Sequence, residues 1–333
     1  MQKVVLITGA NSGVGYSVAD RLLEIEPTLT ICLACRNVMR AEVARRELLA
    51  KHGQSTIDIQ SVDTSELKSV YKAAEEIKQR YECLDYLYLN AGIMPVSTFN
   101  WKVFIKGLFS VSRVIEMLTT GEGLLYLKDH STEDGLKAIF TTNIFGHFVL
   151  VQALEDLLVK SKTHIIWTSS SNARRSNFNI DDVQHEKGSE PYSSSKYAID
   201  LLSLAINEKL NDKGVYSHIT CPGLSMTNIT NSILPKWLWR AITPVMCSMR
   251  LFVPRITLSP YNSAEALVWL FQQDPATVSQ DRKYISHCNV LGKRYTHSET
   301  IDYDPDDANE LYEKLAGLER IFRSRYTGHG DAC

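Results

Sequence analysis

Short apolar runs recur along the chain and alternate with amphipathic stretches. The runs with the length and character of buried strands are Val4–Thr8, Thr30–Cys35, Ile57–Val62, Leu84–Leu89, His164–Thr168 and Tyr216–Cys221. Strands that are apolar on both faces are typical of a parallel sheet covered by helices. Between the runs lie charged stretches with helical character, such as Arg40–His52 and Glu66–Tyr81. The alternation predicts an α/β fold with a doubly wound parallel sheet.

Two segments interrupt this alternation. The first, about residues 95–131, is longer than one crossover helix requires, and the second, residues 213–264, contains no Asp or Glu. One apolar helical face is expected in the first segment, formed by Trp101, Phe104, Ile105 and Leu108. We expect one domain over residues 1–290, with apolar insertions at about residues 95–131 and about residues 229–260, and a helical C-terminal extension over residues 291–333.

Composition narrows the class of protein. The chain has 333 residues, of which 44% are hydrophobic and 22% charged, which excludes a disordered chain. A formal net charge of −2 gives no electrostatic reason to bind nucleic acid. Cys32 and Cys35 have a metal-like or redox-like spacing, but no second pair or His cluster accompanies them. They lie inside an apolar run and are expected to be core residues, so we expect reduced thiols and no metal. The apolar run at the N-terminus is too short for a signal peptide, so the globular part of the chain is expected on the cytosolic side.

A glycine-rich turn, TGANSGVG, follows the first strand and precedes an apolar-periodic helix. Glycines let the backbone approach a pyrophosphate closely, and a helix N-terminus offers free N–H groups to it. The strand before and the helix after supply the context that this motif needs. The turn predicts a Rossmann-type dinucleotide site, with cofactor-binding candidates Thr8, Gly9, Asn11, Ser12, Gly13, Val14 and Gly15.

Residues after the next strands indicate which dinucleotide binds. Arg36 follows the second strand where NAD-binding proteins place a carboxylate, and a guanidinium suits the 2′-phosphate of NADPH, although a solvated loop Arg would look the same. Asp63 follows the third strand, where it could accept a hydrogen bond from adenine or cap the next helix. Asn90 ends the fourth strand and is expected to border the nicotinamide ribose.

Tyr192 and Lys196 are four residues apart in a predicted helix, so they share one face. The ammonium of Lys196 is expected to lower the pKa of the Tyr192 phenol and make it a general acid for a carbonyl oxygen. Hydroxyl side chains follow the fifth strand, at Ser169–Ser171. Asn143 lies in an apolar helical stretch and needs a buried partner, for which a water relay to Lys196 is one solution. His147, one turn later, is expected to be structural.

In this order along the chain, TGANSGVG, Asn90-Ala91-Gly92, Asn143, Ser170, YSSSK and Pro222-Gly223 resemble the short-chain dehydrogenase/reductase superfamily. The resemblance implies a catalytic tetrad of Asn143, Ser170, Tyr192 and Lys196. It implies that Ser170 polarises the substrate carbonyl, that Tyr192 gives the proton, that Lys196 holds the nicotinamide ribose and that Asn143 anchors a water. It also implies that Pro222, Gly223 and Thr227 form the loop against the nicotinamide carboxamide.

Longer strings, including CLACRN, YLNAGIMP, NIFGHF, EPYSSSKYA and PYNSAEALVWLF, resemble the steroid-reducing members of that superfamily. This resemblance implies NADPH-dependent reduction of the 3-keto group of sterol intermediates in cholesterol synthesis. It also implies reduction of the 17-keto group of estrone to estradiol, and attachment to the endoplasmic reticulum membrane. Reduction of retinal or another lipid carbonyl, and a non-catalytic NADPH-binding scaffold, are the alternative functions. A homodimer is a further expectation.

The acid-free segment is the candidate membrane contact. About residues 229–260 combine basic side chains with large apolar ones, namely Trp237, Trp239, Met246, Met249, Leu251 and Phe252. Arg240 and Arg250 leave too few uncharged residues between them for an untilted span. We expect the segment to lie in the headgroup region, with a tilted span or a soluble substrate lid as alternatives. The glycosylation sequon at Asn228 is expected to be coincidental because it lies beside the predicted cofactor.

Overall fold

The computed structural model describes residues 2–99, 125–225, 243–244 and 246–328 of the chain. Several sequence-based predictions therefore lie outside the described residues. They are the apolar helical face of the first insertion, the cofactor-binding role of Thr227, the sequon at Asn228, and the part of the membrane-facing segment before Thr243.

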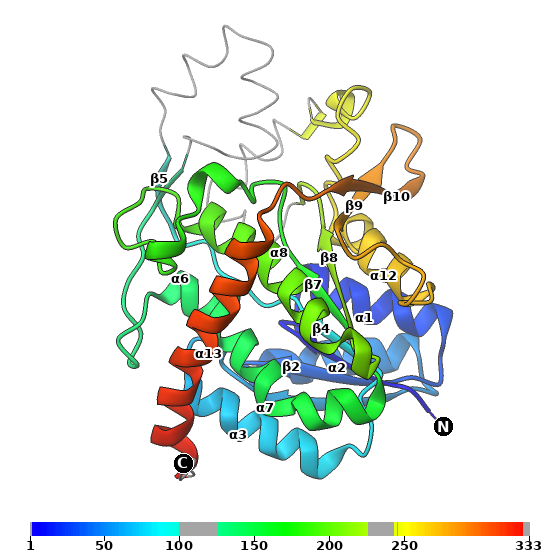
Figure 1. The fold of residues 1–333 in the computed structure, drawn as a ribbon. Coiled ribbons are helices and arrows are strands. Elements are labelled where there is room, and N and C mark those ends of the chain that lie inside the picture. The colour runs from blue at the N-terminus through cyan, green and yellow to red at the C-terminus, as the bar shows by residue number, and fades with distance from the viewer. Residues whose placement is uncertain (1, 100–124, 226–242, 245, 329–333) are drawn as a thin grey trace, which may run out of the picture.

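A single eight-stranded sheet forms the centre of the molecule, in the order β10-β9-β8-β7-β4-β1-β2-β3 (Figure 1). Its strands are β1 (Val4–Thr8), β2 (Thr30–Cys35), β3 (Thr56–Ser61), β4 (Tyr86–Leu89), β7 (His164–Thr168), β8 (Tyr216–Cys221), β9 (Arg282–Cys288) and β10 (Arg294–Thr300). Neighbouring strands are parallel except β9 and β10, which are antiparallel. The predicted strands and the doubly wound parallel sheet are confirmed.

Helices cover both faces because successive strand residues point to opposite sides. Val4 and Leu6 pack in one core, beneath α3 (Leu67–Arg80), α7 (Gly146–Ser161), α8 (Pro191–Leu210) and α13 (Pro305–Thr327). Val5 and Ile7 pack in the other, beneath α1 (Gly13–Ile25), α2 (Val38–Lys51) and α12 (Glu265–Phe271). The short elements are β5 (Val96–Phe99), β6 (Leu125–Leu127), α6 (Ala138–Phe140), η1 (Thr141–Phe145), η2 (Arg175–Asn177), η3 (Ile180–Asp182), η4 (Asn211–Lys213) and α11 (Pro260–Ser263).

The C-terminal residues belong to the same sheet and core. β10 pairs with β9 along its whole length, so the domain boundary expected at residue 290 falls inside a hairpin. Figure 1 shows α13, coloured orange to red, crossing the helical face that includes α8 and α3. It buries Leu311, Leu315 and Phe322 there. The chain from 294 to 327 therefore completes the fold and covers apolar surface that α8 and α3 leave open.

Two further features of the described residues bear on the sequence-based expectations. Cys32 and Cys35 are buried in β2, and burial raises the pKa of their thiols to about 12 and about 11, which confirms them as core residues. None of the helices in the part of the chain that the structure describes combines the length and the apolar character needed to cross a bilayer.

Candidate active site

The glycine turn between β1 and α1 has the geometry of a phosphate cradle. Gly9 and Gly13 have positive φ angles of 68° and 59°, which other residues adopt rarely. A Cβ atom on Gly15 would lie 2.7 Å from Asn90 Nδ2 and 2.7 Å from the Gly9 carbonyl oxygen. Ser12 precedes α1 without a side-chain cap, and the first turn of α1 carries no acidic residue. The free N–H groups and the positive end of α1 therefore fit an anionic pyrophosphate.

Thr8 and Asn90 join the ends of β1 and β4 beside this cradle. The Thr8 hydroxyl oxygen accepts hydrogen bonds from the backbone N–H groups of Asn90 (2.8 Å) and Ala91 (2.9 Å). Asn90 Nδ2 in turn donates to the Thr8 carbonyl oxygen (3.0 Å). Both residues therefore fix the floor of the cofactor site, next to the turn in which Gly15 lies.

His147 links this floor to α7. Its Nδ1 donates to the Asn143 carbonyl oxygen (3.2 Å), which leaves Nε2 to accept the Thr8 hydroxyl (3.0 Å). Burial lowers the pKa of His147 to about 4, so the ring is neutral at physiological pH. The structural role expected for His147 agrees with these contacts.

Arg36 and Asp63 lie together at the ends of β2 and β3. Arg36 Nη1 is 3.5 Å from Asp63 Oδ2, and the Arg36 side chain is 73% exposed, so the guanidinium can reach a phosphate. Asp63 Oδ1 accepts hydrogen bonds from the backbone N–H and the hydroxyl of Ser65. The alternative in which Asp63 caps the following helix is wrong, because α3 begins at Leu67 with Glu66 at its N-cap. Asp63 instead closes the turn before the helix. The contact of Asp63 with adenine stays a prediction.

α8 and the end of β7 bring the catalytic candidates together. The Lys196 ammonium lies 5.7 Å from the centre of the Tyr192 ring and donates to the Thr168 carbonyl oxygen (2.8 Å). Ser170 follows β7 and forms a side-chain hydrogen bond with Tyr192. Ser170, Tyr192 and Lys196 therefore share one small volume at the carboxyl edge of the sheet, where a doubly wound fold places its ligand.

Burial dominates the protonation of these groups. It raises the pKa of Tyr192 to about 12, against the lowering effect of the Ser170 hydrogen bond. It lowers the pKa of Lys196 to about 8, against the raising effect of the Asp200 carboxylate. The expected lowering of the Tyr192 pKa by Lys196 is therefore wrong in this structure. The phenol keeps its proton at neutral pH and can give it to a developing alkoxide.

Asn143 lies in the π-helical turn η1 and takes its partners from the protein. Its Nδ2 donates to Ser195 Oγ (3.0 Å) and the Ile93 carbonyl oxygen (3.2 Å), and its Oδ1 accepts from the Ile93 N–H (2.8 Å). A Cβ atom on Gly92 would be 3.2 Å from Asn143 Oδ1 and 3.7 Å from Lys196 Nζ. Asn143 therefore ties the chain after β4 to α8 beside Lys196, and the water relay between the two residues stays a prediction.

The loop after β8 closes the site from the other side. Gly223 has a φ angle of 70°, and a Cβ atom there would lie 2.4 Å from the Arg255 carbonyl oxygen. Thr257 Oγ1 donates to the Pro222 carbonyl oxygen at 3.2 Å. Pro222 and Gly223 thus run against the chain at 255–257 at the carboxyl end of β8, where the nicotinamide is expected.

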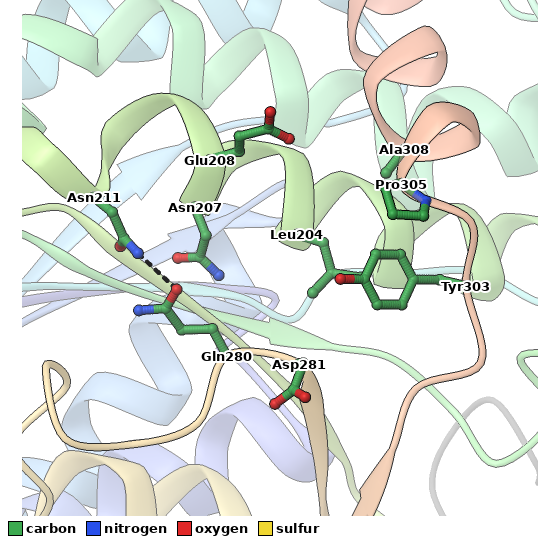
Figure 2. Close-up of a pocket in the computed structure, with 9 residues that line it drawn as sticks. All are labelled: Leu204, Asn207, Glu208, Asn211, Gln280, Asp281, Tyr303, Pro305 and Ala308. Carbon is green, nitrogen blue, oxygen red and sulfur yellow. Dashed lines mark hydrogen bonds between the residues drawn. The ribbon is translucent and has the colours of Figure 1, made fainter.

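A separate cavity of about 260 Å³ lies at the amino ends of β8 and β9 (Figure 2). Asn211 donates to Gln280 across it at 2.6 Å, and the exposed residues Glu208 and Asp281 also line it. Because it lies at the edge of the sheet opposite the glycine turn, it takes no part in the site described above.

Two kinds of site residue were missed by the sequence. The partners of Lys196 and Asn143 are backbone groups of Thr168 and Ile93, for which side-chain patterns carry no signal. Asp200 did leave a signal, since it is a lone carboxylate one turn after Lys196 in the apolar stretch YAIDLL.

Comparisons with known proteins agree with this geometry. A family profile described as short chain dehydrogenase matches residues 3–237. The chain is 50% identical over 325 residues to the rat protein named 3-keto-steroid reductase/17-beta-hydroxysteroid dehydrogenase 7, covering 97% of each chain. It is 49% identical to the human protein of that name, covering 97% of this chain and 95% of the human one.

A solved structure shares the fold at much lower identity. It is a short-chain dehydrogenase from Sphingobium yanoikuyae in complex with NADPH, which matches with a TM-score of 0.55 and 19% identity over 81% of this chain and 84% of that one. The glycine turn, the tetrad geometry and the family match lead to one conclusion: the chain belongs to the short-chain dehydrogenase family.

Proposed function

We propose that this chain is an NADPH-dependent reductase of steroid ketones. Its substrates in this proposal are the 3-keto group of sterol intermediates in cholesterol synthesis and the 17-keto group of estrone. The main support is sequence similarity: the chain is 50% identical, over 97% of both chains, to a rat protein whose name states both activities. The assembly of Ser170, Tyr192 and Lys196 at one edge of the sheet supports the chemistry.

In the proposed reaction each tetrad residue has one task. Bound NADPH supplies the hydride that reduces the carbonyl carbon. Ser170 donates a hydrogen bond to the carbonyl oxygen, and Tyr192, protonated because burial raises its pKa to about 12, gives that oxygen its proton. Lys196 as an ammonium would hold the nicotinamide ribose, and Asn143 fixes the chain at Ile93 beside it. Arg36, exposed at the end of β2, would bind the 2′-phosphate.

The test combines a substrate panel with one conservative variant. The purified protein is incubated with NADPH and 3-keto sterols, estrone or retinal, and the alcohols are identified. We expect steroid alcohols in preference to retinol. Tyr192→Phe should lower turnover about 100-fold or more, because the proton donor is lost, while NADPH binding measured by cofactor fluorescence is unchanged. Preferential reduction of retinal, or full activity of Tyr192→Phe, would contradict the proposal.

We further propose that the end of the molecule around Leu251 rests on the endoplasmic reticulum membrane, with the catalytic domain in the cytosol. Leu251 and Phe252 are 64% and 82% exposed, and Leu291 at the β9–β10 turn is 91% exposed. A hydrogen bond from Cys288 N–H to the Pro254 carbonyl oxygen (2.9 Å) joins the two segments. Figure 1 shows both at the same end of the molecule. Exposed apolar side chains of this size favour the headgroup region of a bilayer.

Vesicle flotation tests this attachment. The full chain is mixed with vesicles of phosphatidylcholine and phosphatidylserine, and the bound fraction is compared with that of Leu251→Ser/Phe252→Ser. We expect the double variant to bind several-fold less. Met39→Ser is the matched control, since Met39 is 76% exposed on α2. Equal loss of binding in the control, or no loss in the double variant, would contradict the proposal.

A further inference from the structure

A buried ion pair lies directly behind the tetrad. Asp200 is one helical turn after Lys196 on α8, and its Oδ2 is 2.5 Å from the Nζ of Lys283 on β9. The side chains of Asp200 and Lys283 are 2% and 13% exposed. Neither residue has a task in the reaction proposed above.

The pair contacts both segments that carry the reacting side chains. Lys283 Nζ also donates to the Ser170 carbonyl oxygen at 3.3 Å, so one ammonium binds the Ser170 loop and Asp200 together. Ser169, the residue before Ser170, donates its hydroxyl to the Lys196 carbonyl oxygen at 3.2 Å. Movement of the pair would therefore displace Ser170 against Lys196.

Stability alone does not explain such a pair. Two charges taken out of water are costly, and well-packed apolar residues in their place are often neutral or stabilising. Lys283 comes from a strand 83 residues away from Asp200 in the sequence, and it reaches Ser170 as well. An ion pair that is costly to bury and touches the catalytic loop is better explained by an effect on the catalytic groups.

The charges around Lys196 come from several elements. Tyr192 and Asp200 face it from α8, Cys221 from β8, Lys283 from β9 and His147 from α7. After burial itself, Asp200 is the largest influence on the pKa of Lys196 and raises it, whereas Lys283 lowers it. The two members of the ion pair therefore act on Lys196 in opposite directions.

We propose that Asp200 and Lys283 are positioning residues for the reductase reaction: Lys283 holds the Ser170 loop, and Asp200 anchors Lys283 and places a carboxylate one helical turn from Lys196. The inference rests on the proposed function, because it assigns supporting residues to the same tetrad. It predicts that the pair controls the alkaline limit of activity, where Lys196 loses its proton.

The test follows turnover and NADPH affinity from pH 6 to pH 10 in the full chain. Asp200→Asn leaves the positive charge of Lys283 without its carboxylate partner. We therefore expect the alkaline limb, which is the decrease in both profiles at high pH, to shift to lower pH by about one pH unit. Asp200→Asn/Lys283→Met removes both opposing charges, so its limb should return part of the way toward that of the unchanged chain. Lys283→Arg keeps the charge and should leave the limb in place.

A purely structural role predicts another pattern, in which all variants lose activity without movement of the limb and the double variant is no better than Asp200→Asn. That pattern would overturn the inference. Glu265→Gln is the matched control, since Glu265 forms a largely buried ion pair with Arg21 (2.6 Å) on the other face of the sheet. It should change stability and leave the limb unmoved, and movement of the limb in this control would also overturn the inference.

NADPH affinity, read from cofactor fluorescence, requires no carbonyl substrate. If the chain binds NADPH but reduces no steroid ketone, the proposed function fails while the shift of the binding profile still tests Asp200 and Lys283. If steroid reduction occurs and neither profile moves in Asp200→Asn, only the further inference fails.

Discussion

Two buried polar clusters flank Lys196, and they solve the problem of burying polar groups differently. The first, the neutral cluster, consists of Thr8, Asn90, Asn143 and His147, joined by hydrogen bonds between uncharged groups. The second, the charged pair, consists of Asp200 and Lys283. In the neutral cluster Thr8, Asn143 and His147 are buried and Asn90 is half-buried. In the charged pair the side chains of Asp200 and Lys283 are 2% and 13% exposed.

The difference lies in what each cluster can control. Hydrogen bonds between neutral groups fix positions, because each donor has a directional acceptor. A charged pair in a medium of low dielectric also acts on its neighbours at a distance. The neutral cluster therefore holds the glycine turn, the Asn90 turn and η1 in register, whereas the charged pair bears on the protonation of Lys196. Substitutions and pH changes that affect only the neutral cluster or only the charged pair should therefore have different effects.

The largest effect on cofactor binding is expected from Gly15→Ala, which disrupts the neutral cluster through Asn90. The added Cβ would lie 2.7 Å from Asn90 Nδ2 and 2.7 Å from the Gly9 carbonyl oxygen, both of which are held in place. Overpacking of this kind costs about 1–3 kcal/mol, so NADPH affinity measured by titration should fall about tenfold to 100-fold. Gly53→Ala is the control, because its Cβ would meet only the Leu49 carbonyl oxygen at 3.8 Å. Equal affinities for both variants would contradict the geometry of the turn.

Acid should act on the two clusters in opposite senses. Burial lowers the pKa of His147 to about 4, below its usual value of 6.5. As the pH falls from 6.5 to 4, His147 becomes protonated in the unfolded chain while it stays neutral in the folded chain. The unchanged chain should therefore lose about 3 kcal/mol of unfolding free energy relative to His147→Gln between pH 7 and pH 4. Urea unfolding at each pH measures this difference, and equal pH slopes in the two proteins would contradict it.

For Asp200 the sign is reversed. Burial raises the pKa of its carboxyl above the usual 3.8, so the folded chain takes up this proton before the unfolded chain does as pH falls. The unchanged chain should gain unfolding free energy relative to Asp200→Asn as the solution is acidified toward pH 4. The same urea series checks this prediction. A loss of unfolding free energy in place of the gain would show that the pKa of Asp200 is lowered in the folded chain, because attraction to Lys283 outweighs burial.

The smallest effect is expected from an exposed ion pair that resembles the charged pair in chemistry only. Arg255 and Glu299 are 2.9 Å apart, and their side chains are 32% and 46% exposed. Glu299→Gln should change the free energy of unfolding by less than about 1 kcal/mol, because solvent screens the pair. Urea unfolding at neutral pH provides the value. If Glu299→Gln changed the free energy of unfolding as much as Asp200→Asn does, burial would not explain the difference between the two ion pairs.

The sequence by itself determined six of the eight strands of the sheet, the glycine turn and the candidates for the tetrad. Apolar runs and helical periodicity are local signals, so the strands and the helices between them followed from residues close in the chain. The four-residue spacing of Tyr192 and Lys196, and the glycines at the end of β1, are local in the same sense. The resemblance to the family then assigned their roles.

Only the tertiary structure decided what surrounds these residues. Lys283 reaches Asp200 across 83 residues, and Ile93 reaches Asn143 across 50. The C-terminal residues, expected to form an extension, complete the sheet as β10 and cover α8 and α3 with α13. The pKa of Tyr192 was predicted in the wrong direction because it depends on how deeply the phenol is buried. Periodicity records the face that a residue presents, but the partner on that face and the depth of burial are set by segments distant in sequence.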